Sequence, residues 1–267
     1  MSTAETENQQ SIEAIAAQIV RYRRDGQRLA ASSAKWNIAS ELQADLIQDR
    51  VAALIGEPVD GWKLGAVDQD GRDRLGLSKP FIGRVFRSRQ QHSPATLSAK
   101  LLPECYIESE IAFRLGRDLP PRSAPYTHVE VKAALQSCHA AYEIVDFSWP
   151  SRDGLGGIDF VADNGGCGGM VVGPGREDWR GLDLTQEAIV FDIDGKTVAQ
   201  GRVRKSADQL VEHIVWFANY MGTRGGLTAG QYITTGTWTG MPPLRAGQTA
   251  TARFSSLGTV QAKLPAG

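Results

Sequence analysis

The chain of 267 residues contains 42% hydrophobic and 22% charged residues and has a formal net charge of −1 at pH 7. These values are those of an ordinary globular protein, which excludes overall disorder, and they leave no basic excess for nucleic-acid binding. Charged residues interrupt every apolar stretch before the roughly 20 residues that a membrane-spanning helix needs, so we expect no membrane partner.

Three cysteines, Cys105, Cys138 and Cys167, occur without the close spacing of a zinc motif. An odd number of cysteines in a chain of this length favours free thiols in a reducing compartment. The polar, acidic segment MSTAETENQQ lacks the basic and apolar regions of a secretion signal. We therefore expect a cytoplasmic protein.

Residues 1–56 are predicted to be helical. Residues 11–25 carry an apolar stripe at helical spacing, and Ser11 is the candidate N-cap. A second helix is expected over about 40–55, ended by Gly56. Its predicted apolar face consists of Leu42, Leu46, Ile47 and Leu54.

From residue 57 to residue 267, glycines and prolines separate short β-branched runs, which predicts a β-rich body. One helix is predicted at about 128–142, begun by a capping box of Thr127 and Glu130 and ending beside Glu143. The expected strands are 82–86, 106–113, 231–236, 249–254 and 259–264.

Two further elements have clear local signals. Asp194 and Gly195 predict a hairpin turn within 188–201, because a two-residue turn of this kind needs positive φ angles. A helix is predicted over 206–221 with Ser206 as its cap. Segments 87–100 and 148–157 are typical of exposed loops. Because no linker or repeat is present, we expect a single catalytic domain over residues 1–267.

Acidic residues at alternate positions mark the strand around 106–113. Glu108 and Glu110 lie on the same face of that strand. Carboxylates this close raise each other's pKa unless a cation lies between them. Glu143 is a third acid that could approach the same place, and three carboxylates suit Mg²⁺ or Mn²⁺ better than zinc. Spacing alone leaves open the alternative that Glu108 and Glu110 line a solvated sheet face.

His139 and the glycine-rich segment 163–169 are two further places where a function could lie. On a helix, His139 and Glu143 would meet at a spacing of four residues, which makes His139 a candidate acid–base group. The alternative is a structural histidine, the more frequent outcome. Segment 163–169, DNGGCGG, lacks the Lys-Ser/Thr of a phosphate-binding loop, so nucleotide binding is not predicted.

Five blocks in order carry a family resemblance. They are GWKLGAVDQDGRDRLGLSKPFIGRVF (61–86), IESEIAFRLGRDLP (107–120), AAYEIVDFSW (140–149), FVADNGGCGGMVVG (160–173) and WFANYMGTRGGLTAGQYITTGTWTG (216–240). Together they resemble the 2-keto-4-pentenoate hydratase and 4-oxalocrotonate decarboxylase family, a branch of the fumarylacetoacetate hydrolase superfamily. The resemblance covers about residues 40–260. It implies an α+β fold, a mixed β-rich roll like the fumarylacetoacetase C-terminal domain, with an N-terminal helical region and flanking helices, assembled as a homo-oligomer.

The resemblance also implies a metal site and a catalytic lysine. The glutamates that bind the family's divalent cation match Glu108, Glu110 and Glu143, with Mg²⁺ or Mn²⁺ as the expected ion. The lysine of the family's G-(Y/F)-K-(I/L)-G block matches Lys63, which is expected to face the substrate. The alternative for Lys63 is a solvated strand lysine.

Four further residues are substrate-binding candidates. Asp163 and Asn164 match a wall of the family's active pocket, with an ordinary turn as the alternative. Thr235 and Thr237 are candidates for binding a substrate carboxylate, with a glycine-rich strand end as the alternative.

The chain departs from the family pattern in three places. Residues 66–68 are Ala-Val-Asp where the family often has Leu-Thr-Ser, and residues 79–82 replace a frequent Gln-Pro-Asp motif, which removes an acid. The arginine usual beyond the third glutamate is absent, and Arg152 is the candidate substitute. These changes favour one alternative, a catalytically impaired binding or assembly partner.

The resemblance implies an enzyme that adds water to a small 2-hydroxy-2,4-dienoate of the 2-keto-4-pentenoate type. The product would be a 4-hydroxy-2-oxo acid in aromatic meta-cleavage catabolism. Two enzymatic alternatives are decarboxylation of 4-oxalocrotonate and hydrolytic C–C cleavage of an acylpyruvate. The last would use a His–Glu pair to activate water, which makes His139 the discriminating residue.

Overall fold

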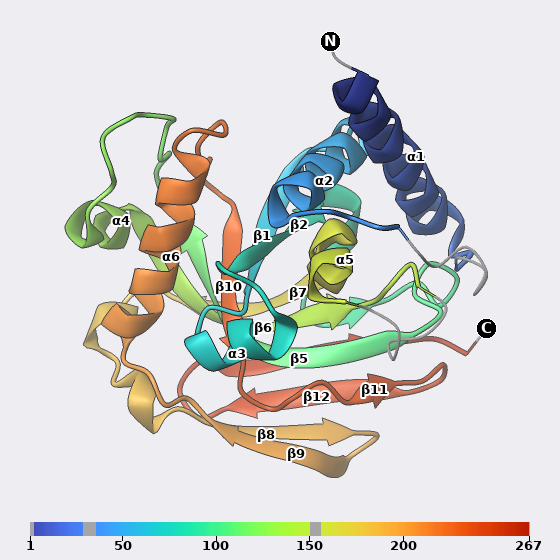
Figure 1. The fold of residues 1–267 in the computed structure, drawn as a ribbon. Helices are drawn as coiled ribbons and strands as arrows, with labels where there is room; N and C mark the ends of the chain where they lie inside the picture. Colours follow the sequence, from blue (N-terminus) through green and yellow to red (C-terminus); the bar gives the residue numbers. More distant parts are fainter. Residues whose placement is uncertain (1–2, 29–35, 150–155, 267) are drawn as a thin grey trace.

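Two β-sheets and the helices that cover them make up the protein, as Figure 1 shows. The structure is a computed structural model that describes residues 3–28, 36–149 and 156–266. The larger sheet has eight strands and the smaller has five. The predicted α+β class, with an N-terminal helical region and a β-rich body, is confirmed. No helix in the described ranges is long and apolar enough to span a membrane.

The larger sheet has the order β2-β1-β10-β5-β6-β7-β3, and β11 pairs with β5 outside this path. Most neighbours are antiparallel, but β1 with β10 and β3 with β7 are parallel. The strands are β1 Val59–Gly65, β2 Phe81–Phe86, β3 Gln90–His92, β5 Cys105–Leu115, β6 Leu135–Val145, β7 Cys167–Arg176, β10 Tyr232–Thr237 and β11 Pro243–Leu244.

The smaller sheet packs beside the larger one through β13, which contacts β6 and β7. Its order is β4-β13-β12-β8-β9. Its strands are β4 Ala95–Thr96, β8 Ala188–Ile193, β9 Lys196–Arg202, β12 Thr249–Phe254 and β13 Gly258–Lys263. The β8–β9 turn has positive φ angles at Asp194 (50°) and Gly195 (78°), which confirms the predicted hairpin.

Helix α1, Thr3–Asp25, begins eight residues before the predicted start. Ser11 therefore lies inside the helix, and its assignment as N-cap is wrong. The reason is that the preceding residues are largely Glu, Gln and Ala, which propagate a helix well. The predicted stripe does form the buried face, with Ile15 and Ile19 almost inaccessible to solvent.

Helix α2, Glu41–Ile55, has the predicted bounds, with Ser40 as N-cap and Gly56 as a left-handed C-cap. Its predicted apolar face is partly wrong, because Leu42 and Leu46 are exposed. The helix instead buries a mixed face that includes Gln48, whose amide donates hydrogen bonds to the carbonyls of β2 and α5 (Gly157–Ala162). These tertiary hydrogen bonds set the rotation of the helix.

The predicted helix over 128–142 is the main error of the sequence analysis. Only α4, His128–Ala134, is helical, and it begins with the predicted Thr127–Glu130 capping box. From Leu135 the chain continues as β6, paired with β5 on one side and β7 on the other. Nearly every residue of β6 is buried. The segment LQSCHAAYEIV mixes apolar and polar residues without strict alternation, so pairing on both edges decides for the strand.

The remaining predictions have mixed outcomes. Helix α6, Ala207–Met221, begins at a Ser206 capping box as expected. The predicted loop 87–100 contains the 3-10 turn Arg87–Arg89 and strands β3 and β4. In the second predicted loop, 148–157, Ser148 and Trp149 are buried. Residues 150–155, and therefore Arg152, lie outside the described residues.

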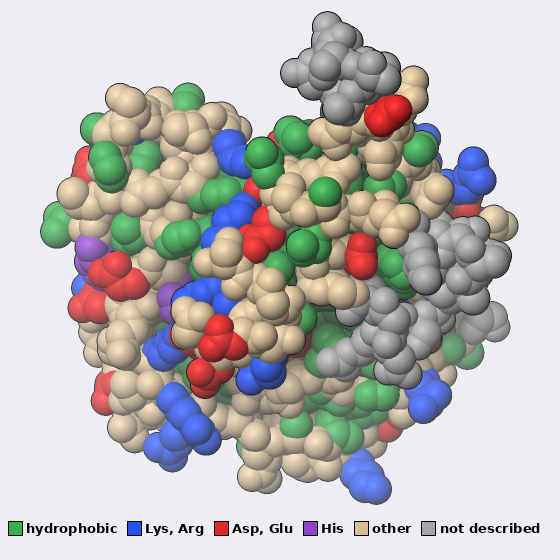
Figure 2. Space-filling view, viewed as in Figure 1, with side chains coloured by type: hydrophobic (Ala, Val, Ile, Leu, Met, Phe, Trp, Pro, Cys, Tyr) green, Lys and Arg blue, Asp and Glu red, His purple; other side chains and the backbone are tan. Residues whose placement is uncertain are grey.

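One short helix, α3 Gln69–Leu75, was not predicted from the sequence. It presents charged side chains of both signs to solvent (Figure 2).

Candidate active site

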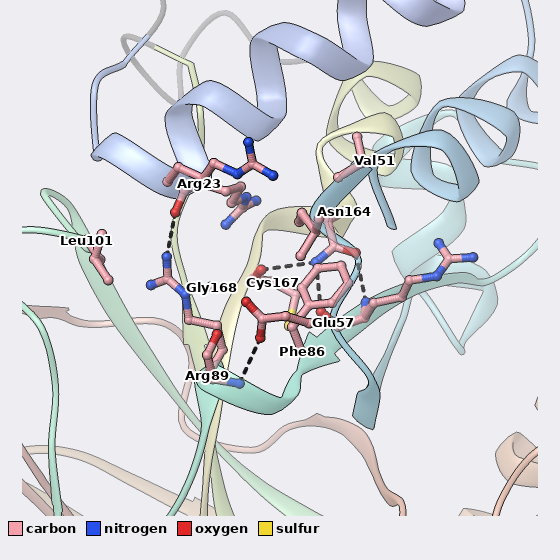
Figure 3. A pocket seen from close by; sticks show the side chains of 13 residues that line it. Arg23, Val51, Glu57, Phe86, Arg89, Leu101, Asn164, Cys167 and Gly168 are labelled. Carbon is pink, nitrogen blue, oxygen red and sulfur yellow. Dashed lines mark hydrogen bonds between the residues drawn. The ribbon is translucent and has the colours of Figure 1, made fainter. Parts of the chain in front are cut away.

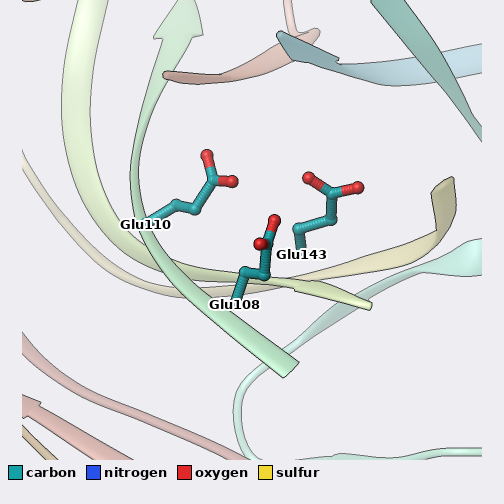
Figure 4. A group of neighbouring side chains, drawn as sticks. All are labelled: Glu108, Glu110 and Glu143. Atoms are coloured by element: carbon teal, nitrogen blue, oxygen red, sulfur yellow. The ribbon is translucent and has the colours of Figure 1, made fainter. Parts of the chain in front are cut away.

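Three glutamates from two neighbouring strands meet on one face of the larger sheet. Glu108 of β5 is directly opposite Glu143 of β6, and Glu110 follows two residues later on the same face of β5. One carboxylate oxygen from each residue lies within 4.8 Å of the others. Figure 4 shows the three carboxylates turned toward a common point. The prediction that these residues converge is confirmed, although Glu143 comes from a strand rather than a helix end.

Burial makes this arrangement unfavourable without a compensating charge. Glu110 and Glu143 are each 1% exposed. Burial and the charges of Glu143 and Glu108 raise the pKa of Glu110 well above its ordinary value. Burial also raises the pKa of Glu143, but a neighbouring lysine opposes the shift. The site therefore attracts cations, because each bound positive charge favours the ionised carboxylates.

Lys63 supplies one such charge. It is 4% exposed, and its Nζ lies 3.1 Å from Oε1 of Glu143. Burial lowers its pKa, but the charges of Glu143 and Glu108 outweigh this, so the net pKa is raised and the side chain is an ammonium. The same Nζ lies 4.8 Å from the centre of the Phe81 ring and 5.3 Å from that of Phe160. Cation–π attraction adds to its stabilisation there.

The contact between Lys63 and Glu143 depends on the curvature of the sheet. Lys63 is on β1, and two strands, β10 and β5, lie between β1 and β6. In a flat sheet β1 and β6 would be about 14 Å apart, since neighbouring strands are about 4.8 Å apart. Side chains stand roughly perpendicular to a flat sheet, so their ends would also remain far apart, and the observed 3.1 Å contact indicates that the sheet curls around the glutamates.

A cavity of about 940 Å³ opens above the three glutamates and Lys63. Its apolar wall comes from β6, the segment after it, α5, β2 and the segment after β10. Its polar wall comes from β10, and α3 with the residue before it adds charged groups. The apolar wall is Phe81, Val145, Phe147, Phe160 and Met241, and the charged groups from the α3 region are Asp68, Asp70 and Arg74.

Similarity to known proteins identifies the family of the chain. Residues 92–264 match the fumarylacetoacetate (FAA) hydrolase C-terminal family. The chain belongs to this family. A 2-hydroxyhexa-2,4-dienoate hydratase from Comamonas testosteroni is 30% identical over 216 residues, 79% of this chain and 80% of the relative. A 2-keto-4-pentenoate hydratase from Paraburkholderia xenovorans is 29% identical over 224 residues, 84% of this chain and 81% of the relative.

Solved structures show the same fold. The 4-oxalocrotonate decarboxylase from Pseudomonas putida G7, complexed with magnesium and adipate, superposes with a TM-score of 0.82 at 21% identity, covering 98% of both chains. A fumarylpyruvate hydrolase from Pseudomonas aeruginosa, in complex with Mn²⁺ and pyruvate, superposes with a TM-score of 0.55 at 15% identity over 79% of this chain and 91% of that chain. The FAA hydrolase C-terminal-like roll is thereby confirmed.

In this family member, the glutamate group can hold a divalent cation. Hard cations are bound by oxygen atoms at about 2.0–2.6 Å, so ligand oxygens around one ion lie up to roughly 5 Å apart. The separations of at most 4.8 Å among the three carboxylate oxygens fit that range. The donor set is oxygen only, which suits a hard cation rather than zinc.

Thr235 and Thr237 both line the cavity, as expected, but their hydroxyl protons are already used. The hydroxyl of Thr235 donates to the carbonyl of Ile111 at 3.0 Å, and that of Thr237 donates to the carbonyl of Gly240 at 3.1 Å. Between them, the backbone amide of Gly236 donates to Oε2 of Glu110 at 2.7 Å. Gly236 has a φ of 110°, a conformation that favours glycine.

Asp163 and Asn164 lie outside this cavity. Asp163 is fully buried, pairs with Arg23 of α1 at 3.1 Å and accepts a hydrogen bond from the amide of Ser148. The side chain of Asn164 accepts from the amide of Arg84 and donates to the carbonyls of Arg84 and Cys167, so it joins β2 to β7. Both side chains therefore stabilise the cavity wall on its side away from the cavity.

His139 also lies outside the cavity. Its ring nitrogens contact the Ser137 hydroxyl at 2.8 Å and the Gly173 carbonyl at 3.0 Å, and its ring packs edge-on against Tyr232. Burial lowers its pKa, which favours the neutral ring. The helical pairing with Glu143 is wrong, because residues four apart on a strand are separated by about 13 Å.

The aromatic part of the site was not predicted from the sequence. Phe81 and Phe160 face Lys63, and neither was among the predicted site residues. Helix α3 and Gly236 were also missed. For Gly236, the available sequence signal was its place in the repeated Thr-Gly pattern of 235–240.

Proposed function

We propose that the protein is a metal-dependent hydratase that adds water to a 2-hydroxy-2,4-dienoate and releases a 4-hydroxy-2-oxo acid. The observation that carries the proposal is the group of three carboxylates beside a buried lysine at the base of a cavity. The reaction type is supported by relatives that are named hydratases and that this chain matches over about four fifths of their length.

We propose Mg²⁺ or Mn²⁺ as the cation, held by Glu108, Glu110 and Glu143, because the donor set is oxygen only. When bound, the cation supplies Lewis acidity that polarises the 2-oxo or enol oxygen of the substrate. Gly236 keeps Glu110 in place through its backbone amide. Thr235 and Thr237 remain candidates to contact the substrate carboxylate from the polar wall, but their hydroxyls would have to turn away from the carbonyls of Ile111 and Gly240 to donate to it.

Lys63 is the proposed catalytic group of the chain itself. Its ammonium is buried at the edge of the glutamate group, so it can stabilise negative charge that develops on the substrate oxygens. Its distance of 3.1 Å from Glu143 also permits proton exchange between the two side chains. The raised pKa of Lys63 favours the role of a charge-stabilising group over that of a neutral base.

The apolar wall favours substrates with an apolar distal group. Beyond Glu143, strand β6 leads to Val145 and then Phe147, both buried at the cavity. A substrate bound by its 2-oxo acid end and extended along this wall would place its distal carbons against apolar side chains. A distal carboxylate there would lose its hydration without a partner, which costs several kcal/mol.

A 4-oxalocrotonate-type decarboxylase is the second candidate, supported by Arg74 in the cavity wall. Among the described residues, Arg74 has no carboxylate within ion-pair distance, so it could bind the second carboxylate of such a substrate. The acylpyruvate hydrolase alternative is less well supported, because His139 lies outside the cavity. An impaired binding or assembly partner would keep the cation site without turnover.

The decisive experiment is the Glu108→Gln substitution, assayed by the loss of dienol absorbance with added Mg²⁺ and by product analysis. Loss of one anionic ligand is expected to reduce kcat/KM at least about a hundredfold, as for other groups that stabilise the transition state. Glu104→Gln is the matched control, because Glu104 pairs with Arg28 outside the cavity. Wild-type turnover that survives both Glu108→Gln and chelation of the metal would refute the proposal.

Three further expectations remain proposals. We propose that residues 1–267 act as one catalytic domain, that the protein assembles as a homo-oligomer and that it resides in the cytoplasm. Support for the last comes from the thiols of Cys105, Cys138 and Cys167, which are free and buried. Size-exclusion chromatography with light scattering measures the subunit number directly.

A further inference from the structure

A second cavity lies behind the active-site wall, and we call it the arginine cavity. It has a volume of about 230 Å³ and lies between α1, α2, the 3-10 turn Arg87–Arg89 and β7 (Figure 3). Arg23 and Arg24 of α1 and Arg89 of the turn line it. We call the cavity above the three glutamates and Lys63 the metal cavity. None of its lining residues lines the arginine cavity.

The charges around the arginine cavity are only partly compensated. Arg23 pairs with Asp163, but its Nε is buried without a hydrogen-bond partner. For Arg24 and Arg89, no carboxylate lies within ion-pair distance among the residues that the structure describes. They donate instead to carbonyl groups, those of Leu54 at 3.0 Å and of Arg23 at 2.6 Å.

Arg89 is the group that gains most from an added anion. It reaches from the turn toward α1, where its guanidinium lies beside Arg23 (Figure 3). Burial and the nearby charge of Arg23 lower the pKa of Arg89, which shows that its charged form is disfavoured where it stands. Glu57 is the one carboxylate in the lining; it is exposed and accepts a hydrogen bond from the Ser88 amide.

The other side of the arginine cavity is apolar. Val51 and Ile55 of α2, Phe86 of β2 and Leu101 form it. Val51 and Phe86 are buried, whereas Ile55 and Leu101 are partly accessible from the cavity. A site with guanidinium groups on one side and an apolar surface on the other fits a ligand of the same two-sided character.

We propose that the arginine cavity binds a small organic carboxylate that carries a compact apolar body, such as an aromatic ring. The carboxylate would accept hydrogen bonds from Arg24 and Arg89, while the apolar body would lie against α2 and Phe86. Inorganic oxyanions match the charge of this site but leave its apolar surface uncovered. The proposal concerns a site separate from the metal cavity and does not depend on the hydratase reaction.

The location of this site places a bound carboxylate directly behind the active-site wall. Asn164, Cys167 and Gly168 line the arginine cavity. The intervening Gly165 faces the opposite way, since a Cβ atom added to it would lie 2.7 Å from the Phe81 ring and 2.9 Å from Cε of Lys63. One short segment therefore separates the ligand from the catalytic lysine.

Calorimetric titration of the full-length, Mg²⁺-loaded protein with benzoate tests the proposal. We expect saturable binding that weakens at least about tenfold in Arg89→Gln and several-fold in Arg24→Gln, because each loses a charge-assisted hydrogen bond. Arg21→Gln is the matched control, since Arg21 is exposed on the same helix and outside the lining. Benzamide, which has the same shape without the charge, should bind at least about tenfold more weakly than benzoate.

Two results would overturn the proposal. One is the absence of benzoate binding at millimolar concentration, or binding that both arginine variants leave unchanged. The other is inorganic phosphate binding as tightly as benzoate, which would contradict the role of the apolar side. If Arg89→Gln does not fold, Arg24→Gln carries the test, because Arg24 is exposed. Repeating the titration with Glu108→Gln separates the two cavities: unchanged affinity supports the arginine cavity, and lost affinity places benzoate at the glutamates.

Discussion

Replacement of Lys63 by methionine tests the electrostatic design of the active site most directly. Methionine keeps much of the length of the side chain and its packing against Phe81 but removes the charge 3.1 Å from Glu143. At that distance, an effective dielectric constant of about 20 gives an attraction of about 5 kcal/mol. Removing one partner of a buried ion pair usually costs about 3–5 kcal/mol.

The free energy of unfolding of the metal-free Lys63→Met variant should therefore fall by about 3 kcal/mol, the lower end of the range, because Glu143 can take up a proton. That loss corresponds to a decrease in Tm of roughly 10 °C in a protein of this size. Thermal unfolding in the presence of a chelator measures it. The control is Lys132→Met, which removes an exposed pair with Asp208 and should cost less than about 1 kcal/mol.

The pH dependence of this loss has a definite sign. Lys63 lowers the pKa of Glu143 against the effect of burial, so its removal raises that pKa further above the unfolded value. A group with a raised folded-state pKa contributes stability at low pH and loses it as the pH rises. The deficit of Lys63→Met should thus be small near about pH 5 and full near about pH 8. A deficit that does not change with pH would refute this account of the site.

Three other predictions use separate measurements. Mg²⁺ affinity, measured by calorimetry, should fall as the pH is lowered, because Glu110 has a raised pKa and must lose its proton to bind the ion; stronger binding at low pH would contradict this. Burial raises the pKa of Asp146 to about 6, so the wild-type protein loses stability as the pH rises through that value. Near neutral pH, the free energy of unfolding of Asp146→Asn, measured in urea, should therefore exceed that of the wild-type protein by up to about 3 kcal/mol. A difference that does not depend on pH would refute the assignment. Gly165→Ala should lower the free energy of unfolding by about 1–3 kcal/mol, because Gly165 has a φ of 60° and its methyl group would meet Phe81; Gly181→Ala, with nothing within 4 Å, is the control and should change it by less than about 0.5 kcal/mol.

The sequence by itself determined the helix caps and the hairpin turn, because each depends only on residues close together in the chain. The Ser206 cap, the Thr127–Glu130 capping box and the Asp194–Gly195 turn all formed as predicted, because each depends on hydrogen bonds or φ angles within a few residues. Alternation in β5 likewise placed Glu108 and Glu110 on one face. The family resemblance then added Glu143 as the third candidate ligand, and the structure places it beside the other two glutamates even though its secondary structure was predicted wrongly.

The tertiary structure decided everything that depends on partners distant in the chain. β6 is a strand because β5 and β7 satisfy its backbone on both edges, and its mixture of apolar and polar residues did not by itself distinguish a strand from a helix. Lys63 meets Glu143 only because the sheet curls. Asp163 turns away from the active site because it pairs with Arg23, 140 residues earlier, and no local pattern encodes a contact of that range.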